Sequence, residues 1–382
     1  MKKNNLTTEF ATRKKIDLFS SIYNNLPDPD KLLKSNGYNF DFYRDLLTDP
    51  HLSATFRQRK SQVMQMGWEI ENIEDNNLKN ELIDWLSKLN LNKIYDDILD
   101  ALLFGFSVIE IIWEIKDNKF VPVDLIEKPQ EWFIFDKNNT LKIRNKKFGY
   151  YEFAEGEDLP DYKFILVQNN PDYNNPYGER LLSKVYWPVM FKRASFEKWH
   201  NYSEKFGTPF LLGYYSDIMT EQEKNDLLDK IEEAIENNIA LIKQGTILEF
   251  KESMKYQAGD IFENMIELQN KEISKAVLGE TLTIEVERSG SYKAAEIHKE
   301  MLEYLGLSDK KLVEAAFNTL IKFYMQINYG KDEQIKFKLN KKESIINASE
   351  KRDKILSEMG IKFTKEYFKK RYNLSDKDFE II

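Results

Sequence analysis

The sequence predicts an α+β fold in two or more parts, and three observations lead to this prediction. With 382 residues, 42% of them hydrophobic, the chain is long enough and apolar enough to bury more than one core. Helical and strand-like patterns alternate in its first half, whereas long helical patterns dominate its second half. All ten prolines and all six tryptophans lie at or before Pro209, which marks an organisational boundary there.

Before Pro209, helix-period apolar patterns alternate with short runs of β-branched and aromatic residues. The broadest run, 106–115, predicts a strand buried on both faces. Residues 169–178 are dense in turn formers and predict a surface connector. Short consecutive strands of this kind are typical of antiparallel hairpins. The expected helices are 8–23, 40–47, 52–65, 78–89 and 93–103, and the other expected strands are 68–73, 120–123, 132–135, 148–153 and 164–168.

A long helical pattern follows residue 178 and contains Pro188. We expect Pro188 to break or kink this helix after Trp187, because proline lacks the N–H that the helix needs and clashes with the preceding turn. Aromatic stripes at helical spacing are usually core, and we interpret the stripe beyond Trp187 in that way. Its members are Phe191, Ala194, Trp199, Tyr202 and Phe206.

Residues 260–328 predict two helices joined by a loop. The first repeats apolar residues at three- and four-residue spacing until Gly279, which ends it as a residue free to take positive φ. The second resumes at about Tyr292 and ends at Gly330, so it is roughly 57 Å long if it is unbroken near Gly306. The remaining expected elements are an insert with strand 210–215, helix 221–236 and strands near 239–242 and 246–251, then strand 335–339 and helices 343–359 and 365–372.

Composition narrows the compartment and the class of function. The chain has no cysteine, so it has neither disulfides nor thiolate metal sites, and a reducing compartment is expected. Its N-terminus is polar and no run approaches the ~20 apolar residues of a membrane span, so we interpret the protein as cytoplasmic. A net charge of −8 argues against a surface that grips nucleic acid, although it permits a channel that encloses it.

No catalytic constellation is found in the sequence, so we expect no enzyme activity, cofactor or metal. A GxxxxGK[ST] phosphate loop does not occur, which argues against a nucleotide-hydrolysing motor. The histidines have no metal-pair or HExxH spacing, and Ser289 and Ser291 lack a glycine elbow. The acidic loop 155–161 has carboxylates for a hard cation but not the spacing of a calcium loop, so an exposed turn is favoured. The histidines are His51, His200 and His298, and the loop carboxylates are Glu155, Glu157, Asp158 and Asp161.

Seven short motifs follow one another along the chain: DPHLS (49–53), RQRK (57–60), GWEI (67–70), LFGFSVIE (103–110), NPYG (175–178), FGTP (206–209) and SKAVLGETLT (274–283). Together and in this order they resemble the portal proteins of Mu-like tailed bacteriophages and prophages. The resemblance covers nearly the whole chain, from about Asp49 to the end. It rests on the order of the motifs, because none of them is decisive alone.

The resemblance implies the portal fold and a ring, typically of twelve subunits, at one vertex of a viral capsid. Double-stranded DNA would be packaged and ejected through this ring, which is placed in the virion, and in the host cytoplasm during assembly. The implied partners are further copies of the chain, DNA, the packaging terminase, the major capsid protein and a head-completion adaptor, without a membrane. The implied parts are an α+β wing (1–176), a first stem helix (177–207), a small α/β clip (208–257), a second stem helix (258–278), a tunnel loop (279–290), a long wing helix with a returning strand (291–342) and a small helical crown (343–382).

The distribution of charge suits such a channel. Residues 217–300 carry 19 acidic and 10 basic side chains, whereas residues 331–382 carry 10 acidic and 14 basic ones. A basic wall would hold DNA through many phosphate contacts, while an acidic wall with occasional cations lets it slide. The residues expected to line the channel are Lys271, Lys275, Glu280, Glu285, Glu287 and Arg288. Those expected to dock the motor and the adaptor on the clip are Glu221, Asp226, Lys230 and Glu233.

Two other classes stay open. An oligomeric scaffold or adaptor explains the long helices equally well, and particle size in solution separates it from a ring with an axial hole. A metal-dependent nucleic-acid enzyme would need a metal or acid–base cluster, for which the acidic loop 155–161 is the one weak candidate.

Overall fold

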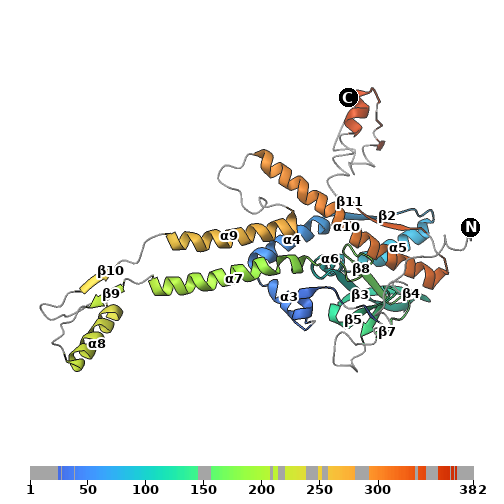
Figure 1. Ribbon diagram of the computed structural model, residues 1–382. Coiled ribbons are helices and arrows are strands. Elements are labelled where there is room, and N and C mark those ends of the chain that lie inside the picture. Colours follow the sequence, from blue (N-terminus) through green and yellow to red (C-terminus); the bar gives the residue numbers. More distant parts are fainter. Residues whose placement is uncertain are drawn as a thin grey trace, which may run out of the picture. The chain divides into compact units, whose positions relative to one another are not determined.

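The chain divides into two compact units (Figure 1). Unit 1 combines Met1–Lys184 with Val277–Ile382, and unit 2 is Val185–Ala276. Two distant stretches of the sequence therefore fold together in unit 1. The structure is a computed structural model that describes residues 25–26, 28–37, 39–144, 156–206, 210–213, 220–237, 248–251, 257–279, 292–331, 334–340, 352–361, 363–364 and 366–367.

Capping side chains set the starts of the short helices in unit 1. Asp30, Asp49, Asp75 and Asn90 each accept a hydrogen bond from a backbone N–H in the first turn of the helix that follows. The expected helices between residues 40 and 103 are confirmed, with ends that differ by a few residues. The helices are α2 (Lys31–Ser35), α3 (Asp41–Leu46), α4 (Pro50–Met64), α5 (Asn76–Lys88) and α6 (Leu91–Phe104).

The strands of unit 1 form three sheets. Every pairing among the described strands is antiparallel, as the hairpin pattern predicts. The sheet orders are β1-β5-β6-β7, β4-β3-β8 and β11-β2, so the last strand of the chain pairs with one near its start. The strands are β1 (Asn25–Leu26), β2 (Gly67–Glu71), β3 (Phe106–Lys116), β4 (Lys119–Lys128), β5 (Phe133–Asp136), β6 (Leu141–Arg144), β7 (Gly156–Asp158), β8 (Phe164–Gln168) and β11 (Lys336–Asn340).

Strand β3 is buried on both faces only in its first half. Residues 106–109 are buried, whereas Ile115 is 64% exposed. The expectation of two-sided burial along the whole run is therefore wrong. The reason is that β8 pairs only with residues 106–110, so the rest of β3 lies in a two-stranded ribbon with β4 and has less cover.

The long helix α10 (Tyr292–Tyr329) passes through Gly306 without a break. A Cβ at Gly306 would lie 2.8 Å from the Cβ of Gln62 on α4, so glycine permits a close approach of the two helices. Phe317 of α10 stacks on Phe337 of β11 with ring centroids 4.5 Å apart, and Phe337 stacks on Trp68 of β2 at 5.8 Å. These rings join α10 to the β2–β11 ribbon.

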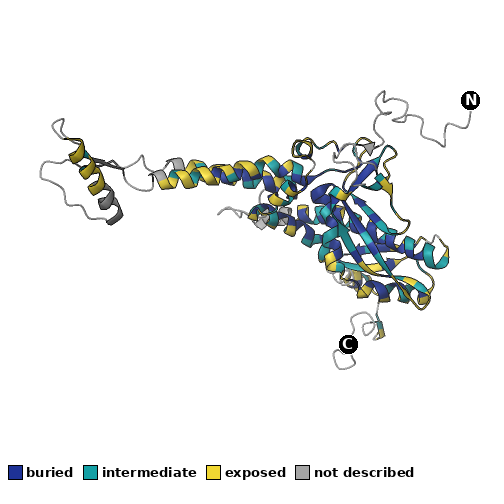
Figure 2. Ribbon diagram, turned by 90° about the horizontal axis from the view of Figure 1, so that it is seen from below, coloured by how far each residue is buried: buried dark blue, intermediate teal, exposed yellow. Residues whose placement is uncertain are grey.

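Unit 2 consists of two helices with a small α/β insert between them. Helices α7 (Leu181–Phe206) and α9 (Gln257–Leu278) run antiparallel and side by side in both views, and the ring centroids of Tyr202 and Phe262 are 5.9 Å apart (Figures 1 and 2). In the insert, β9 pairs antiparallel with β10. The insert elements are β9 (Phe210–Gly213), α8 (Glu221–Asn237) and β10 (Leu248–Lys251).

Pro188 lies inside α7, which continues to Phe206. Of the two outcomes expected after Trp187, a break or a kink, the break does not occur. A proline removes one helical N–H donor, but the turns on either side keep their own hydrogen bonds, and a long helix retains enough of them to persist.

Several expectations fall on residues outside the described part of the chain. These are helix 8–23, strand 148–153, the strand near 239–242 and most of helix 365–372. Residues 352–358 of the expected helix 343–359 are helical. Among the described helices, none combines the length and the apolarity that a membrane crossing requires.

Candidate functional site

Helix α7 presents an apolar stripe to solvent. Trp187, Met190 and Phe191 are between 37% and 55% exposed, and the rings of Trp187 and Phe191 stack with centroids 5.6 Å apart. At 3.6 residues per turn these side chains share one face of the helix, opposite the buried Val185 and Val189. We call Trp187, Met190 and Phe191 the α7 stripe.

The interpretation of the aromatic residues of α7 as core is wrong for the single chain. Phe191 and Ala194 are exposed, and Trp199 and Tyr202 are half-buried, while the side chain of Phe206 is outside the described part. Periodicity identifies an apolar face but not the body that covers it, so the pattern could not distinguish a core from an interface.

Helix α9 has a stripe of the same kind. Ile261, Met265 and Leu268 lie at i, i+4 and i+7 and are between 41% and 59% exposed, which we call the α9 stripe. Ile266 and Ile273, on the other side of the helix, are buried. Both helices of unit 2 therefore have more apolar surface than unit 2 covers (Figure 2).

The two helices also carry opposite net charges. α7 has five Lys and Arg against two Glu, whereas α9 has two Lys against four Asp and Glu. An α7 face and an α9 face are therefore complementary in charge as well as apolar at their centres.

The structure describes only part of the expected channel set. Lys275 on α9 is exposed and forms an ion pair with Glu272 at 2.6 Å, and Lys271 is half-buried. The other four residues lie outside the described part of the chain. They are Glu280, Glu285, Glu287 and Arg288.

Three of the four expected docking residues are exposed on α8. Glu221, Asp226 and Lys230 lie at its surface, and the side chain of Glu233 is outside the described part. Thr220 and Glu223 form a capping box at its start, because the Thr220 N–H donates to Glu223 Oε2 at 3.0 Å and the Glu223 N–H donates to Thr220 Oγ1 at 3.4 Å.

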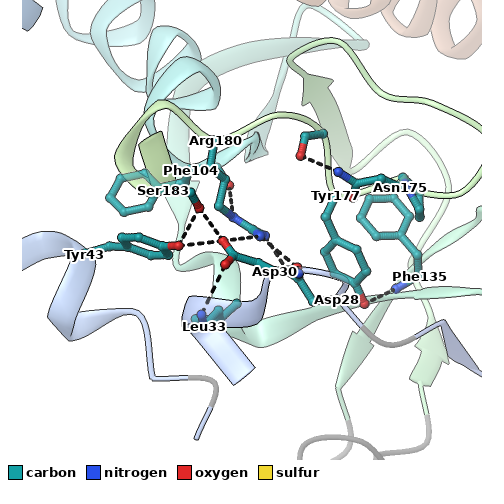
Figure 3. A network of polar contacts seen from close by, with 12 residues as sticks. Asp28, Asp30, Leu33, Tyr43, Phe104, Phe135, Asn175, Tyr177, Arg180 and Ser183 are labelled. Atoms are coloured by element: carbon teal, nitrogen blue, oxygen red, sulfur yellow. Dashed lines mark hydrogen bonds and ion pairs between the residues drawn. The ribbon is translucent and has the colours of Figure 1, made fainter. Parts of the chain in front are cut away.

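A buried charge cluster precedes α7 in unit 1 (Figure 3). Arg180 donates to both carboxylate oxygens of Asp28, to Asp30 at 3.3 Å and, through Nε, to the carbonyl oxygen of Phe104 at 2.7 Å. Asp30 also accepts hydrogen bonds from Tyr43 and Ser183, both at 2.5 Å. The cluster ties the segment before α2 to the first turn of α7.

The ionisation of this cluster is fixed by its contacts. Burial works to lower the pKa of Arg180, but the charges of Asp28 and Asp30 raise it. Burial works to raise the pKa of Asp30, but hydrogen bonds from Ser183 and Tyr43 and the charge of Arg180 lower it. Arg180 and Asp30 therefore both favour their charged forms, and each charge offsets the cost of burying the other.

Two motifs meet at a pair of glycines. A Cβ on Gly178 would lie 2.2 Å from the carbonyl oxygen of Gly105, and both glycines have positive φ. The Asn169 N–H donates to the same Gly105 oxygen at 2.8 Å. Tyr177, which precedes Gly178, is only 1% exposed, and its ring centroid lies 5.8 Å from that of Phe106 on β3. The expectation of a surface connector is therefore wrong for the end of 169–178, where packing against β3 requires burial.

Arg59 joins α4 and α10 to the last turn of α9, which lies in unit 1. Its guanidinium donates to the two oxygens of Asp309 on α10 at 2.6 and 2.9 Å and to the carbonyl oxygen of Val277 at 2.7 Å. Val277 lies in the last turn of α9, where carbonyl groups lack helical donors and a cation is favourable. Gly279 follows with a φ of +75°, as expected for the residue that ends the helix. Arg59 therefore fixes the end of α9 against α4 and α10.

A carboxylate cluster lies between α4, α6 and β4. Lys60 pairs with Asp96 at 2.9 Å and with Asp100. Glu127 of β4 accepts hydrogen bonds from Ser107 at 3.2 Å and Gln130 at 3.0 Å. Burial, followed by the charges of Asp100 and Asp97, raises the pKa of Glu127 to about 8. Glu127 is therefore largely protonated at neutral pH.

The expected acidic turn has no arrangement for a cation in the part that is described. Glu157, Asp158 and Asp161 are exposed, and Asp158 pairs with Lys142 at 2.8 Å, while Glu155 lies outside the described residues. Within the described ranges, no group of three or more His, Asp or Glu side chains is placed to hold a metal ion.

Comparison with solved structures defines the class of fold. A chain from the virion of the native gene transfer agent particle matches with a TM-score of 0.63 and 12% identity, covering 94% of this chain and 98% of that chain. A chain from the neck of the native gene transfer agent particle, computed with C12 symmetry, matches with a TM-score of 0.59 and 12% identity, covering 95% and 99%. The fold is thus one found in chains of virion-like particles.

Sequence comparison is more specific. The family model for the portal protein of Mu bacteriophage matches residues 40–374, and the chain belongs to this family. The portal protein of Escherichia phage Mu is 27% identical over 261 residues, which are 66% of this chain and 50% of that protein. The Mu-like prophage FluMu protein gp29 of Haemophilus influenzae is 27% identical over 283 residues, which are 70% and 52%. The chain therefore spans about half the length of these curated relatives, and the resemblance seen in its motifs is confirmed.

The residues that anchor the helices have no sequence pattern that reveals their contacts. Arg59, Gly105 and Gly178 lie inside the motifs RQRK, LFGFSVIE and NPYG. The motifs therefore marked these residues but did not indicate which residues they contact. Arg180 and Asp28 lie outside the motifs, and nothing in the sequence connects two residues so far apart.

Proposed function

We propose that the chain is a portal subunit, whose copies close a ring at one vertex of a capsid and form the conduit for double-stranded DNA during packaging and ejection. The family match over residues 40–374 carries this proposal. The α7 and α9 stripes support assembly, because a single chain leaves both of them in water. The C12 symmetry of the neck that contains a fold neighbour supports twelve as the number of subunits.

Within this proposal, the two units take different parts. α7 and α9 form the stem, and residues 208–257 form the clip, which docks the packaging terminase and later a head-completion adaptor. The exposed Glu221, Asp226 and Lys230 of α8 offer charged contacts to these partners. Unit 1 contributes the wing, residues 343–382 form the crown, and the major capsid protein surrounds the ring. The protein acts without catalysis and resides in the virion, and in the host cytoplasm during assembly.

The conduit works by weak repulsion. The acidic residues of the tunnel loop, Glu280, Glu285 and Glu287, repel DNA phosphates weakly and so do not hold them. The basic residues Lys271, Lys275 and Arg288 keep this repulsion from excluding DNA from the channel. Because screening shortens the range of these interactions, passage of DNA depends on ionic strength.

Particle size and shape test the proposal. Mass photometry and negative-stain images of the purified full chain should show closed rings with an axial hole and about twelve times the 45.3 kDa mass of one chain. Particles without a hole would favour a scaffold or adaptor. A stable monomer at every protein concentration and salt, also with capsid protein present, would contradict the proposal.

A further inference from the structure

A cavity of about 430 Å³ lies between helix α5 and the β3–β4 ribbon in unit 1. Its volume is within the roughly 300–1,000 Å³ of pockets that hold ligands. Among its apolar lining residues, Trp85, Leu89 and Pro122 are buried, whereas Val123 is 38% exposed. We call it the ribbon cavity. Its lining comes from residues 81–89 and 116–123, and no other part of the chain that the structure describes fills it.

The charged groups around the ribbon cavity are paired with one another, with one exception. Each of its three lysines forms an ion pair with a neighbouring carboxylate. Asp117, in the turn between β3 and β4, is exposed and forms no ion pair within the described residues. A group that complements the cavity therefore brings apolar side chains for the apolar lining and a cation for Asp117. The pairs are Glu81–Lys119, Asp84–Lys88 and Glu114–Lys116, with N–O distances between 2.5 and 2.8 Å.

Residues 352–361 carry this combination. The Met359 N–H donates to the carbonyl oxygen of Ile355 at 2.9 Å, so the two side chains lie one helical turn apart on the same face. Ile355 is 54% exposed, and Met359, at 74%, is the most exposed large apolar side chain among the described residues. Arg352, three positions before Ile355, adds an exposed cation to this face. We call Ile355 and Met359 the crown stripe.

The C-terminal part packs through the opposite side of this helix. Asp353, ~200° around the helix from Ile355, is 7% exposed and accepts a hydrogen bond from the Tyr367 hydroxyl at 2.9 Å. The ring of Tyr367 stacks on that of Phe363 with centroids 4.7 Å apart. Gly360 follows the helix with a φ of +89°. These contacts leave the crown stripe in solvent.

Resting on the proposed function, we propose that the crown stripe of one copy fills the ribbon cavity of another copy in the ring. Apolar side chains then meet an apolar lining, and Arg352 meets a rim whose unpaired charge is Asp117. Burial of Ile355 and Met359 removes apolar surface of both copies from water. Each copy gives one stripe and receives another, so the contact is heterologous and repeats around a closed ring. Assembly thereby fixes the crown of one copy to the wing of another.

Cysteine cross-linking tests the pairing, because the chain has no native cysteine. Full-length Val123→Cys and Met359→Cys variants are purified separately, mixed under conditions that assemble rings, and oxidised. Both positions are exposed, so neither change disturbs the packing of its own chain. A disulfide requires Cα atoms within about 7 Å, so we expect cross-linked chain pairs in the mixture and none when either variant is oxidised alone. Ile355→Cys replaces Met359→Cys if that variant does not assemble.

The matched control pairs Val123→Cys with Ser357→Cys. Ser357 is exposed in the same segment but lies ~200° around the helix from Met359, so its cross-linked yield should be severalfold lower. Asp117→Lys, added to Val123→Cys, should also lower the yield with Met359→Cys severalfold at low salt, because it replaces attraction for Arg352 by repulsion.

The outcomes separate the pairing from the proposed function. Equal yields at positions 357 and 359, or intact rings without a cross-link between 123 and 359, overturn the inference and leave the proposed function standing. A yield that Asp117→Lys leaves unchanged overturns the assignment of Arg352 to the cavity rim. If the unaltered chain forms no ring under any condition, the proposed function fails and the pairing fails with it.

Discussion

Helices α10 and α7 are both long and amphipathic, but they use their apolar residues differently. α10, in unit 1, buries Phe317, Leu320 and Tyr324 almost completely, whereas α7 leaves Trp187 and Phe191 in solvent and buries Lys192 and Ser195 instead. Unit 1 therefore buries the apolar side chains of its long helix α10 within a single chain. In unit 2, by contrast, large apolar side chains of α7 remain exposed, as the proposed assembly requires.

The largest effect is expected in unit 1. Arg180→Met leaves Asp28 and Asp30 as buried charges without a cation, so the free energy of unfolding should fall by roughly 3–5 kcal/mol. Arg44→Met is the control, because the Arg44–Glu131 pair is partly exposed and its loss should cost under ~1 kcal/mol. Urea unfolding followed by tryptophan fluorescence measures both. Equal losses would show that the cluster does not hold unit 1 together.

A change in the α7 stripe should act on assembly instead. Phe191→Glu removes about 2 kcal/mol of apolar burial from each contact between copies and brings a charge into it, so rings should dissociate while circular dichroism stays unchanged. His200→Glu places the same charge on an exposed, opposite side of α7 and should leave the rings intact. Mass photometry reports the outcome, and rings that survive Phe191→Glu would place the stripe outside the interface.

A pH-dependent effect is expected at Glu127. Its folded pKa, about 8, is raised above the ordinary value of 4.5, so folding favours its protonated form. Stability is therefore lost as pH rises above 4.5, and the loss is complete above about 8. Glu127→Gln removes this loss. The free energy of unfolding of the variant should therefore exceed that of the unaltered chain by on the order of 2 kcal/mol at pH 9 and by much less at pH 6.

Glu114→Gln is the control for this pH dependence, because Glu114 lies in an exposed pair with Lys116. Thermal unfolding of the three proteins between pH 6 and 9 measures the differences. A constant difference between Glu127→Gln and the unaltered chain over this range would refute a raised pKa.

The smallest effect on stability is expected in the tunnel loop. Glu285→Lys combined with Glu287→Lys should change the free energy of unfolding by under ~0.5 kcal/mol and leave rings intact. It should slow DNA passage, most strongly at low salt, because it adds attraction to phosphates where sliding is needed. Packaging measured over a range of salt concentrations tests this, and an unchanged rate would remove the loop from the channel.

Local features of the fold were predictable from the sequence because they depend on neighbouring residues. Gly279 ends α9 with positive φ, and the hairpin pattern gave the antiparallel strands. Features that depend on distant residues were not. Arg59 and Asp309 are 250 positions apart, and the sequence around either residue does not predict that the two form an ion pair. Phe191 shows the same limit, since its helical spacing is the same in a core and in an interface.

The contacts of Arg59 give the fold a mechanical property. A pull on the chain at Gly279 loads the last turn of α9, and the bond from Arg59 to the carbonyl oxygen of Val277 passes that load to α4. The two bonds from Arg59 to Asp309 pass it on to α10, the longest of the described helices. Because all three hydrogen bonds converge on one planar guanidinium, the end of α9 is connected to both α4 and α10 through a single side chain. A force on residues 280–291 is thus distributed over three helices before it can unwind α9.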